Sequence, residues 1–272
     1  MKLIIDIGGT HLRSRLKGDG SSIDSSCPTR DYELVEFIEE YLGRYPTIGF
    51  VGISFAGQVY NGSIVSSPNI RVEHKNIKEY LQQKYKNLRV EIDNDLNCAI
   101  RAESIYHKEE YISALFVGTG IGASLMDRGK IVRGYNNQSF EIGHIPYQKA
   151  PFRCGCGKDN CIELYASGLG IQRWLEYYST DTTPNLAQLK RDRSPIADMF
   201  EDALLRAVAT IITISNSKIL VLGGGVVEKN PYLVEFIQES ISTEVMGVSL
   251  DGVKILSSSL VSATLDGAEL LE

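Results

Sequence analysis

Four side chains in one short stretch are of the types that bind zinc. Cys154, Cys156 and Cys161 fall within eight residues, and His144 lies ten residues before the first of them. Zinc prefers four sulfur or nitrogen ligands in a tetrahedron, and four protein ligands leave no open position for chemistry. The alternative is a group of buried free thiols beside an unrelated histidine. The spacing favours a structural zinc knuckle, because a glycine follows each of the first two cysteines and allows a tight turn.

Three glycine-rich turns each follow a short apolar run, at Asp6–Thr10, Gly118–Gly122 and Gly223–Gly225. Glycine lets backbone N–H groups approach phosphate oxygens, so each turn is a candidate phosphate loop. None matches a Walker A loop or a complete Rossmann fingerprint, and each alone could be a simple turn. Asp6 would repel phosphate unless a cation such as Mg²⁺ lay between them, whereas the Thr10 hydroxyl could donate a hydrogen bond.

Polar residues also stand where an apolar strand ends. Asp93, Asn94 and Asp95 directly follow the apolar run that closes at Ile92. The carboxyl ends of strands face ligand crevices in α/β proteins, which makes these residues candidates for a site. Aspartate and asparagine are equally favoured as helix N-caps, and the pattern alone supports both interpretations.

Two further carboxylates flank the cysteine-rich stretch. Glu141 lies three residues before His144, and Glu163 lies two residues after Cys161. A zinc ion that fixed this loop would also fix both carboxylates. Without zinc, they would be ordinary solvent-exposed charges.

The composition is that of a globular protein. Hydrophobic residues make up 43% and charged residues 23% of the 272, which argues against global disorder. A net charge of −6 without a basic run argues against a general nucleic-acid binder. No apolar stretch reaches the roughly 18–20 residues of a membrane span, and Asp6 interrupts the first apolar run too early for a signal peptide. We therefore expect a cytoplasmic protein without nucleic-acid or membrane partners, in which Cys27 and Cys98 are free thiols.

Strand and helix patterns alternate along the chain. Helical spacing predicts helices over 32–42, ended by Gly43, and over 195–215. Apolar runs predict strands over 3–7, 12–16, 48–54, 88–92, 113–117, 123–126, 219–222 and 254–257. This alternation indicates an α/β fold, and the recurrence of strand, glycine turn and strand suggests a duplicated unit. No Pro-, Gly- or Ser-rich linker is present, so we expect a hinge near residue 105.

Taken together, these motifs resemble the ROK family of repressors, sugar kinases and uncharacterised open reading frames. The glutamate–histidine motif combined with the cysteine knuckle is the most specific part of the resemblance. The matching motifs span nearly the whole chain and read Asp6-Ile-Gly-Gly-Thr10, Asp93-Asn-Asp95, Gly118-Thr-Gly-Ile-Gly122, Glu141-Ile-Gly-His144, Cys154-Gly-Cys-Gly157, Cys161-Ile-Glu163 and Leu222-Gly-Gly-Gly225.

The resemblance implies an actin/hexokinase-like α/β fold, in which two ribonuclease-H-like domains close over an interdomain cleft. The N-terminal domain would cover residues 1–105, and the C-terminal domain 106–272 with the zinc knuckle. The last helix could pack back on the N-terminal domain. ATP with Mg²⁺ would be the phosphoryl donor, a sugar the acceptor, and zinc a structural ion. Family members are often homodimers.

The resemblance also implies roles for individual residues. Asp95 matches the general base that accepts the proton of the attacking sugar hydroxyl, and His144 would bind both zinc and sugar. Sugar contacts are implied for Asn69, Asn94, Asp95, Glu141, His144 and Glu163. Phosphate contacts are implied for Asp6, Gly8, Gly9, Thr10, Gly118, Thr119, Gly120 and Gly122. The adenosine would lie near Gly223, Gly224 and Gly225.

Within the family, the chain is most similar to D-allose kinases. This similarity rests on Thr10-His-Leu-Arg13, Ile64-Val-Ser-Ser-Pro-Asn69, Asp95-Leu-Asn97, His144-Ile-Pro146 and Gly170-Ile-Gln-Arg-Trp174. Glucose, fructose and N-acetylhexosamines such as N-acetylmannosamine are the alternative substrates, and the 6-hydroxyl is the family's usual acceptor. A sugar-sensing repressor would need a DNA-binding segment before Asp6, and a silent sugar-binding protein would not need Asp95.

Two stretches depart from the family pattern. Asn160 stands where a glycine is usual; we expect the knuckle to survive, because asparagine tolerates left-handed backbone better than most residues. Bulky or polar residues occupy Tyr135–Phe140, where small residues are common before Glu141. This second departure is expected to bear on the choice of sugar.

Overall fold

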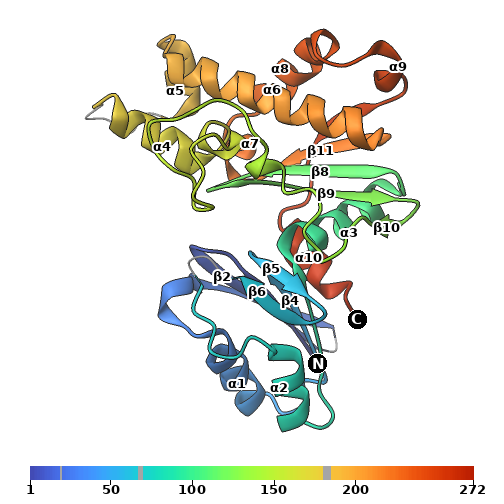
Figure 1. Ribbon diagram of the computed structural model, residues 1–272. Helices are drawn as coiled ribbons and strands as arrows, with labels where there is room; N and C mark the ends of the chain where they lie inside the picture. Colours follow the sequence, from blue (N-terminus) through green and yellow to red (C-terminus); the bar gives the residue numbers. More distant parts are fainter. Residues whose placement is uncertain (19, 67–69, 180–184) are drawn as a thin grey trace. The chain divides into compact units, whose positions relative to one another are not determined.

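The computed structural model describes residues 1–18, 20–66, 70–179 and 185–272. The chain divides into two compact units (Figure 1). Unit 1 contains Met1–Lys108, Arg133–Ser139 and Leu260–Glu272, and unit 2 contains Glu109–Val132 and Phe140–Ser259. The division into 1–105 and 106–272 stays a prediction about folding domains. In the compact units, two later segments join the N-terminal part of the chain.

The sheet of unit 1 has five strands in the order β3-β2-β1-β4-β7. The first three strands form antiparallel pairs, while β1, β4 and β7 run parallel. A separate hairpin pairs the short strands β5 and β6. The strands are β1 (Lys2–Ile7), β2 (His11–Gly18), β3 (Ser21–Pro28), β4 (Phe50–Phe55), β5 (Gln58–Tyr60), β6 (Ser63–Ser66) and β7 (Arg89–Asn94).

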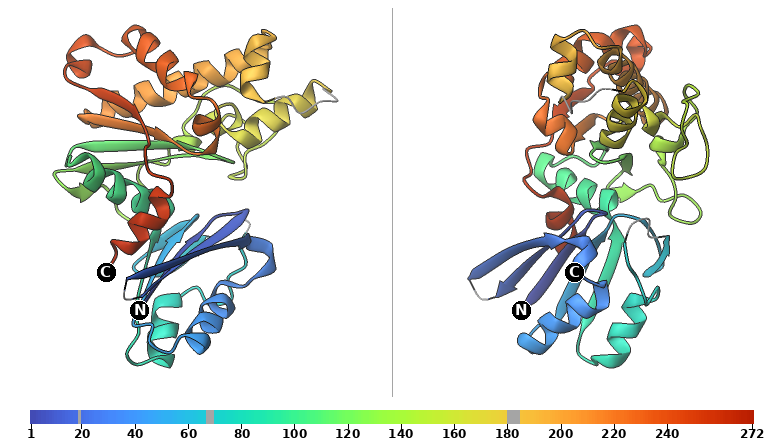
Figure 2. Two further views of the ribbon diagram at one scale, coloured as in Figure 1. Left: turned by 180° about the vertical axis from the view of Figure 1, so that it is seen from behind. Right: turned by 90° about the vertical axis from the view of Figure 1, so that its left-hand side faces the viewer.

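Both faces of this sheet are covered at its centre, which explains why β4 is buried throughout and β1 is buried from Leu3 to Ile7 (Figures 1 and 2). Leu3 and Ile5 pack in the larger core with α1 and α2, whereas Ile4 joins a smaller cluster with α3 and α10. Alternate residues of a strand face opposite sides, so a doubly covered strand reads as a continuous hydrophobic run. The helices of unit 1 are η1 (Thr29–Asp31), α1 (Leu34–Arg44), α2 (Ile77–Lys84), α3 (Asp95–His107) and α10 (Ala263–Glu269).

Helix α1 confirms the helical pattern but not its expected end. The Glu33 carboxylate accepts hydrogen bonds from the amides of Val35 and Glu36 and so begins the helix. The helix continues through Gly43 to Arg44, so the prediction that Gly43 ends it was wrong. A single glycine costs a helix only about 1 kcal/mol, which the packing of the other residues offsets.

Helix α10 approaches the backbone of unit 1 so closely that glycine is required at two positions. A Cβ on Gly267 would lie 1.7 Å from the carbonyl oxygen of Cys98 in α3, and a Cβ on Gly52 of β4 would lie 2.4 Å from the carbonyl oxygen of Ala268. Leu265 and Ala268 fill the cluster beneath α10 with Ile4 and Phe50 of the sheet, so these two glycines let the helix bury its apolar face.

Unit 2 repeats the same topology with the order β10-β9-β8-β11-β12. Its first three strands are antiparallel, and β8, β11 and β12 run parallel. The duplication that the sequence suggests is therefore confirmed as two sheets with one strand order. The strands are β8 (Ile112–Val117), β9 (Ile121–Asp127), β10 (Lys130–Ile131), β11 (Ile219–Gly223) and β12 (Lys254–Ser257).

The longest helix of unit 2 has the bounds that the sequence predicts. Helix α6 (Pro195–Ser215) begins after the Ser194 cap and ends at Asn216, which takes the left-handed conformation. No helix among the described residues is long and apolar enough to cross a membrane. The other helices are η2 (Ile142–His144), η3 (Ile162–Leu164), α4 (Gly168–Tyr177), α5 (Leu186–Arg191), α7 (Gly225–Lys229), α8 (Tyr232–Ser240), η4 (Ile241–Thr243) and α9 (Gly247–Leu250).

The close approach of α10 gives a stability prediction. Gly267→Ala should lower the free energy of unfolding by about 1–3 kcal/mol, because the new methyl group meets backbone atoms that cannot rotate away. Gly43→Ala is the matched control: its Cβ would meet nothing within 4 Å, and the change should raise the free energy by about 0.5–1 kcal/mol. Urea denaturation measures both, and equal effects of the two changes would contradict the packing argument.

Candidate active site and zinc site

The register of the unit 1 sheet aligns four polar residues across neighbouring strands. Arg13 on β2 lies opposite Asp6 on β1, Asp6 lies beside Ser54 on β4, and Ser54 lies beside Asp93 on β7. The Ser54 hydroxyl donates to Asp6 Oδ1 at 2.7 Å, and Arg13 Nη2 pairs with Asp6 Oδ2 at 2.7 Å. Asp6, only 4% exposed, thus has a partner for each oxygen.

The turn after β1 contains three of the predicted phosphate-binding residues, Gly8, Gly9 and Thr10. Gly8 N–H donates to the His11 carbonyl at 2.9 Å, which closes the turn between β1 and β2. The Thr29 hydroxyl holds the turn from behind by donating to the Gly8 carbonyl at 2.7 Å. Gly9 and Thr10 are exposed. The predicted residues therefore form one short turn, with Asp6 at its base.

Asn94 caps helix α3, which is the structural alternative that the sequence left open. Its Oδ1 accepts hydrogen bonds from the amides of Leu96 at 3.0 Å and Asn97 at 3.3 Å. Its Nδ2 donates to the Gly57 carbonyl and to Asp95 Oδ1, each at 3.0 Å. The cap therefore fixes Asp95 at the first position of the helix, and a sugar contact by Asn94 stays a prediction.

Asp95 has the electrostatic character of a base that works near neutral pH. Burial raises the pKa of Asp95 to about 7, and the negative charge of Asp6 adds to this shift. Hydrogen bonds from the Leu96 amide and from Asn94 oppose the shift but do not cancel it. A carboxyl group tuned in this way can accept a proton at neutral pH and release it afterwards.

In unit 2, the four predicted zinc ligands meet at one point. The ligand atoms of His144, Cys154, Cys156 and Cys161 all lie within 4.8 Å of one another. Cys156 Sγ is 3.4 Å from Cys161 Sγ, and Cys154 Sγ is 3.6 Å from His144 Nδ1. Zn–S bonds of about 2.3 Å and Zn–N bonds of about 2.0 Å place tetrahedral ligands roughly 3.5–3.8 Å apart. The four side chains therefore fit a closed, structural zinc site.

Backbone pairing explains why residues ten or more apart in sequence converge. Pro146 and Cys161 form an antiparallel bridge, and Ile162 N–H donates to the Ile145 carbonyl at 3.1 Å. These contacts lay the segment after His144 beside the segment that carries Cys161. The knuckle closes with a hydrogen bond from Gly157 N–H to the Cys154 carbonyl at 2.9 Å.

The thiols would release protons on binding zinc, because only a thiolate is a good ligand. Burial raises the pKa of Cys154 and of Cys161. Burial also opposes ionisation of Cys156, but the backbone N–H and charge of Lys158 and the hydrogen bonds from the other two thiols together lower its pKa. Cys156 is also the exposed member of the set, so it is the ligand most ready to meet an incoming ion.

The zinc knuckle is packed directly against the Gly118–Gly122 turn. The Glu163 carboxylate lies so close to Gly120 that a Cβ there would be 2.7 Å from Glu163 Oε2. The Cys154 thiol contacts Glu163 Oε1 at 3.3 Å, so this glutamate lies between a zinc ligand and the turn. Gly143 must also be glycine, because its Cβ would lie 2.6 Å from the Ile121 carbonyl oxygen.

The two glycine turns of unit 2 lie at the ends of neighbouring parallel strands. Gly223 on β11 is in register with Phe116 on β8, so Gly118–Gly120 and Gly223–Gly225 share one edge of the sheet. Gly224 has φ +88°, and its Cβ would lie 2.5 Å from the Val117 carbonyl oxygen, so two constraints require glycine there. Ligands of α/β proteins bind at such edges.

The structure shows the backbone at both stretches that depart from the family pattern. Asn160 does not belong to the residues with positive φ; the left-handed position of the knuckle is Gly157, at φ +90°. The knuckle tolerates Asn160 because the backbone there is ordinary, so the expected reason was wrong. Phe140, directly before Glu141, is itself left-handed at φ 63°, and its ring packs against the core of unit 2. Asn69 lies outside the described residues.

A comparison with known protein families matches nearly the whole length of the chain. The sequence model of the ROK family matches residues 3–271. The chain belongs to the ROK family. The motif at each candidate position and the strand order of both sheets agree with this membership.

Similar proteins cover nearly the whole ROK chain. It is 28% identical to an N-acetylgalactosamine kinase of Shewanella sp. (strain ANA-3), over 98% of this chain and 95% of the relative. It is also 28% identical to a glucokinase of Thermotoga maritima, over 96% of this chain and 93% of the glucokinase. Among solved structures, a ROK hexokinase from Thermus thermophilus superposes with a TM-score of 0.79 at 24% identity, over 99% of this chain and 96% of that one. The likeness shows an actin/hexokinase-like fold.

Sequence reasoning about the ROK chain missed three side chains of the candidate site. Arg13 and Ser54 hold Asp6, and Arg133 pairs with Asp93 at 2.5 Å. The first two could have been found by aligning the predicted strands, since they are the register partners of Asp6. Nothing in the sequence around Arg133 indicates its partner, 40 residues earlier.

The zinc site of the ROK chain gives a prediction on metal content. Purified protein should carry about one zinc per chain, and Cys156→Ser should lose the metal and lower the unfolding temperature, because a closed site needs all four ligands. Cys27→Ser, which changes a thiol outside the cluster, should retain the metal and the unfolding temperature of the wild type. Mass spectrometry of the metal and thermal unfolding measure the effect. A wild-type protein that keeps its unfolding temperature after zinc is chelated would refute the structural role.

Proposed function

We propose that the chain is an ATP-dependent sugar kinase that transfers the γ-phosphoryl group of ATP to a hydroxyl of a hexose, with the 6-hydroxyl as acceptor. Asp95 carries this proposal. It stands at the start of α3, its pKa is raised to about 7, and Asp6 at the base of the first glycine turn contributes to that shift. ROK membership and the kinases among the relatives support the assignment.

In the proposed reaction, Asp95 accepts the proton of the sugar hydroxyl as that oxygen attacks the γ-phosphorus. Phosphoryl transfer depends mainly on alignment and charge neutralisation, to which a general base adds about 10²–10⁴-fold. Mg²⁺ would neutralise phosphate charge when it binds with ATP. The turns at Asp6–Thr10, Gly118–Gly122 and Gly223–Gly225 would bind the nucleotide.

Glu141, His144 and Glu163 would bind the sugar hydroxyls together with Asn94, and Asn69 is assigned the same role by resemblance. The knuckle supports this role because His144 is a candidate zinc ligand and Glu163 contacts another, Cys154. When His144 holds zinc through Nδ1, the second ring nitrogen is free in principle to donate to a hydroxyl. Zinc would thus hold the residues that orient the sugar and take no part in the chemistry.

D-allose is the first choice of substrate, on the basis of the motif similarity that begins at Thr10-His-Leu-Arg13. The relatives include an N-acetylgalactosamine kinase and a glucokinase, so N-acetylhexosamines and glucose are the main alternatives, with fructose behind them. A sugar-binding protein without activity is the remote alternative, which the tuned carboxyl group of Asp95 disfavours.

A coupled ADP-release assay over a panel of hexoses tests the function and the substrate. Allose should give the highest kcat/KM among allose, glucose, fructose, N-acetylmannosamine and N-acetylgalactosamine. Asp95→Asn should lower kcat by about 10²-fold or more while sugar still binds in calorimetry, since only the base is removed. Full turnover in this variant would refute the role of Asp95, and no turnover of any sugar by the wild type would refute the kinase.

The pH dependence of the reaction should follow Asp95. The base works only when ionised, so kcat/KM should fall below pH about 7 and level off above it, with sugar and MgATP both below their KM values. Because the folded pKa lies above the usual value of an aspartate, ionisation of Asp95 costs stability as the pH rises through 7. Asp6→Asn should move the acidic limb to lower pH by removing a negative charge. A limb near pH 4 in the wild type would contradict the assignment.

A further inference from the structure

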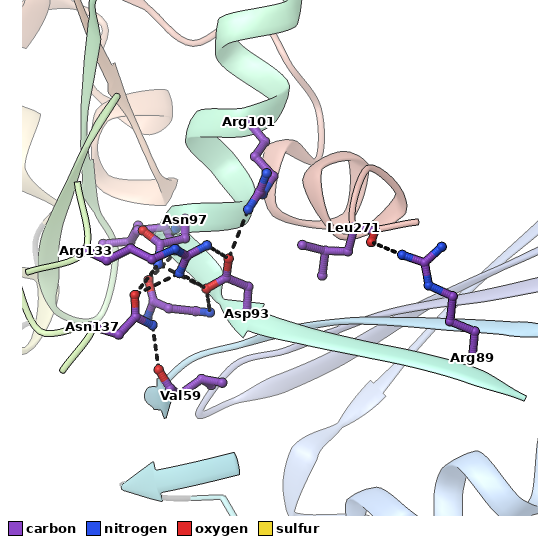
Figure 3. A network of polar contacts seen from close by, with 10 residues as sticks. Val59, Arg89, Asp93, Asn97, Arg101, Arg133, Asn137 and Leu271 are labelled. Carbon is purple, nitrogen blue, oxygen red and sulfur yellow. Dashed lines mark hydrogen bonds and ion pairs between the residues drawn. The ribbon is translucent and has the colours of Figure 1, made fainter. Parts of the chain in front are cut away.

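The segment Arg133–Ser139 leaves the chain of unit 2 and packs entirely within unit 1. Ser139 N–H donates to the Arg133 carbonyl at 3.2 Å, so the segment closes on itself as a compact loop. It contains most of the stretch in which the sequence departs from the family pattern. Two of its side chains, Arg133 and Asn137, point toward the end of β7 (Figure 3).

Arg133 makes a two-pronged contact with Asp93. Its Nη1 donates to Asp93 Oδ1 at 2.9 Å and its Nη2 to Asp93 Oδ2 at 2.5 Å. Asp93 is only 5% exposed, and such bidentate pairs are the most directional of ionic contacts. Burial alone would raise the pKa of Asp93, but the hydrogen bonds and charge of Arg133, together with hydrogen bonds from Asn97 and the Asn94 amide, lower it. Asp93 therefore stays ionised, and its geometry is fixed by Arg133.

Asn137 forms the second contact of the loop. Its Oδ1 accepts from Arg133 Nη1 at 2.8 Å and from Asn97 Nδ2 at 3.5 Å, and its Nδ2 donates to the Val59 carbonyl on β5. Asn137 adopts φ 63°, a conformation that asparagine tolerates and most residues do not. The loop is thus attached both to helix α3 and to the β5–β6 hairpin.

These contacts converge on the turn that carries Asp95. Asp93 Oδ1 also accepts from the Asn94 amide at 2.9 Å and from Asn97 Nδ2 at 3.0 Å. Asp93 and Asn97 lie two residues before and two residues after Asp95, so the network holds the backbone on both sides of it. Arg101 also reaches Asp93, but at 3.4 Å and through one nitrogen (Figure 3).

We propose that Arg133 and Asn137 form a clamp that positions Asp95, acting through Asp93 and Asn97. Arg133 is then a positioning residue and does not itself touch the substrate. The clamp acts on rate because an error of about 1 Å in the position of a reacting group can cost 10²-fold. The loop also leads, two residues later, into Glu141, so one loop determines the path of the chain toward a second candidate sugar ligand.

The clamp accounts for the atypical stretch before Glu141. A small residue at position 137 could not bridge Arg133, Asn97 and the Val59 carbonyl, whereas the asparagine amide satisfies all three. In this chain, hydrogen bonds of the Asn137 side chain therefore fix the loop. The kinetic part of this inference rests on the proposed kinase activity, while the structural part does not.

The test compares Arg133→Met with Arg89→Met. Arg89 is a matched control: it lies on the same strand as Asp93, is half-exposed, and extends away from Asp93 toward the Leu271 carbonyl (Figure 3). Hydrogen–deuterium exchange should rise at the amides of Asn94, Leu96 and Asn97 in Arg133→Met and stay unchanged in Arg89→Met. This measurement needs no substrate.

The kinetic measurement uses the preferred hexose of the wild type. Arg133→Met should lower kcat by about ten- to a hundredfold, with a smaller change in the KM of MgATP, and Arg133→Lys should recover part of the loss. Asn137→Ala should also lower kcat. In the double variant its effect should not add to that of Arg133→Met, since the two residues form one network. Thermal unfolding verifies that each variant is folded.

Failure of the clamp and failure of the proposed function would give different results. Unchanged exchange in Arg133→Met, or raised exchange with unchanged kcat in an active enzyme, would overturn the clamp. A fall in kcat that Arg89→Met shares would overturn it as well. A wild type that phosphorylates no hexose would refute the kinase assignment, and with it the role of the clamp in rate, whatever the exchange shows.

Discussion

The parallel pairing of β1, β4 and β7 is the constraint on which the unit 1 site depends. Hydrogen bonding of these strands sets Asp6, Ser54 and Asp93 in one row, and the adjoining hairpin adds Arg13 at its end. Once the row exists, each buried charge finds a partner: Arg13 and Ser54 serve Asp6, and Arg133 serves Asp93. Buried carboxylates without partners would cost several kcal/mol each, so the register and the ion pairs stabilise one another.

The pKa of Asp95 is raised, whereas the pKa of Asp93 in the same turn is lowered. The proposed chemistry depends on this difference. Asp93 is kept ionised by a bidentate arginine, whereas Asp95 accepts hydrogen bonds from the Asn94 amide and from backbone N–H groups and lies near the charge of Asp6. Asp93 is almost fully buried and Asp95 is partly buried, and the pKa moves in opposite directions at these two positions of one turn. Separated pKa values among neighbouring carboxyl groups are the usual mark of divided roles, here a structural acid and a candidate base.

In unit 1, ion pairs fix the side chains of the candidate site. In unit 2, close packing at glycine residues fixes the position of the candidate zinc site. Gly143 admits the Ile121 carbonyl at a distance that no Cβ allows, and Gly120 leaves room for the Glu163 carboxylate. The zinc knuckle is consequently packed against a candidate phosphate turn. The Glu163 carboxylate, which contacts Cys154 and lies against Gly120, therefore links the candidate zinc site to this turn.

The sequence by itself predicted the four residues that cluster as candidate zinc ligands, the glycine turns at strand ends, the duplicated α/β fold and the bounds of α6. These are local properties, because ligand type, close spacing and hydrophobic period are written in neighbouring residues. Only the tertiary structure decided that Arg13 pairs with Asp6, that Asn94 serves as a cap, and that Arg133 joins Asp93. A period of two assigns a residue to a face of a strand, but the partner across the sheet depends on register. The partner of Arg133 depends further on the path of a loop 40 residues along the chain, which no local pattern encodes.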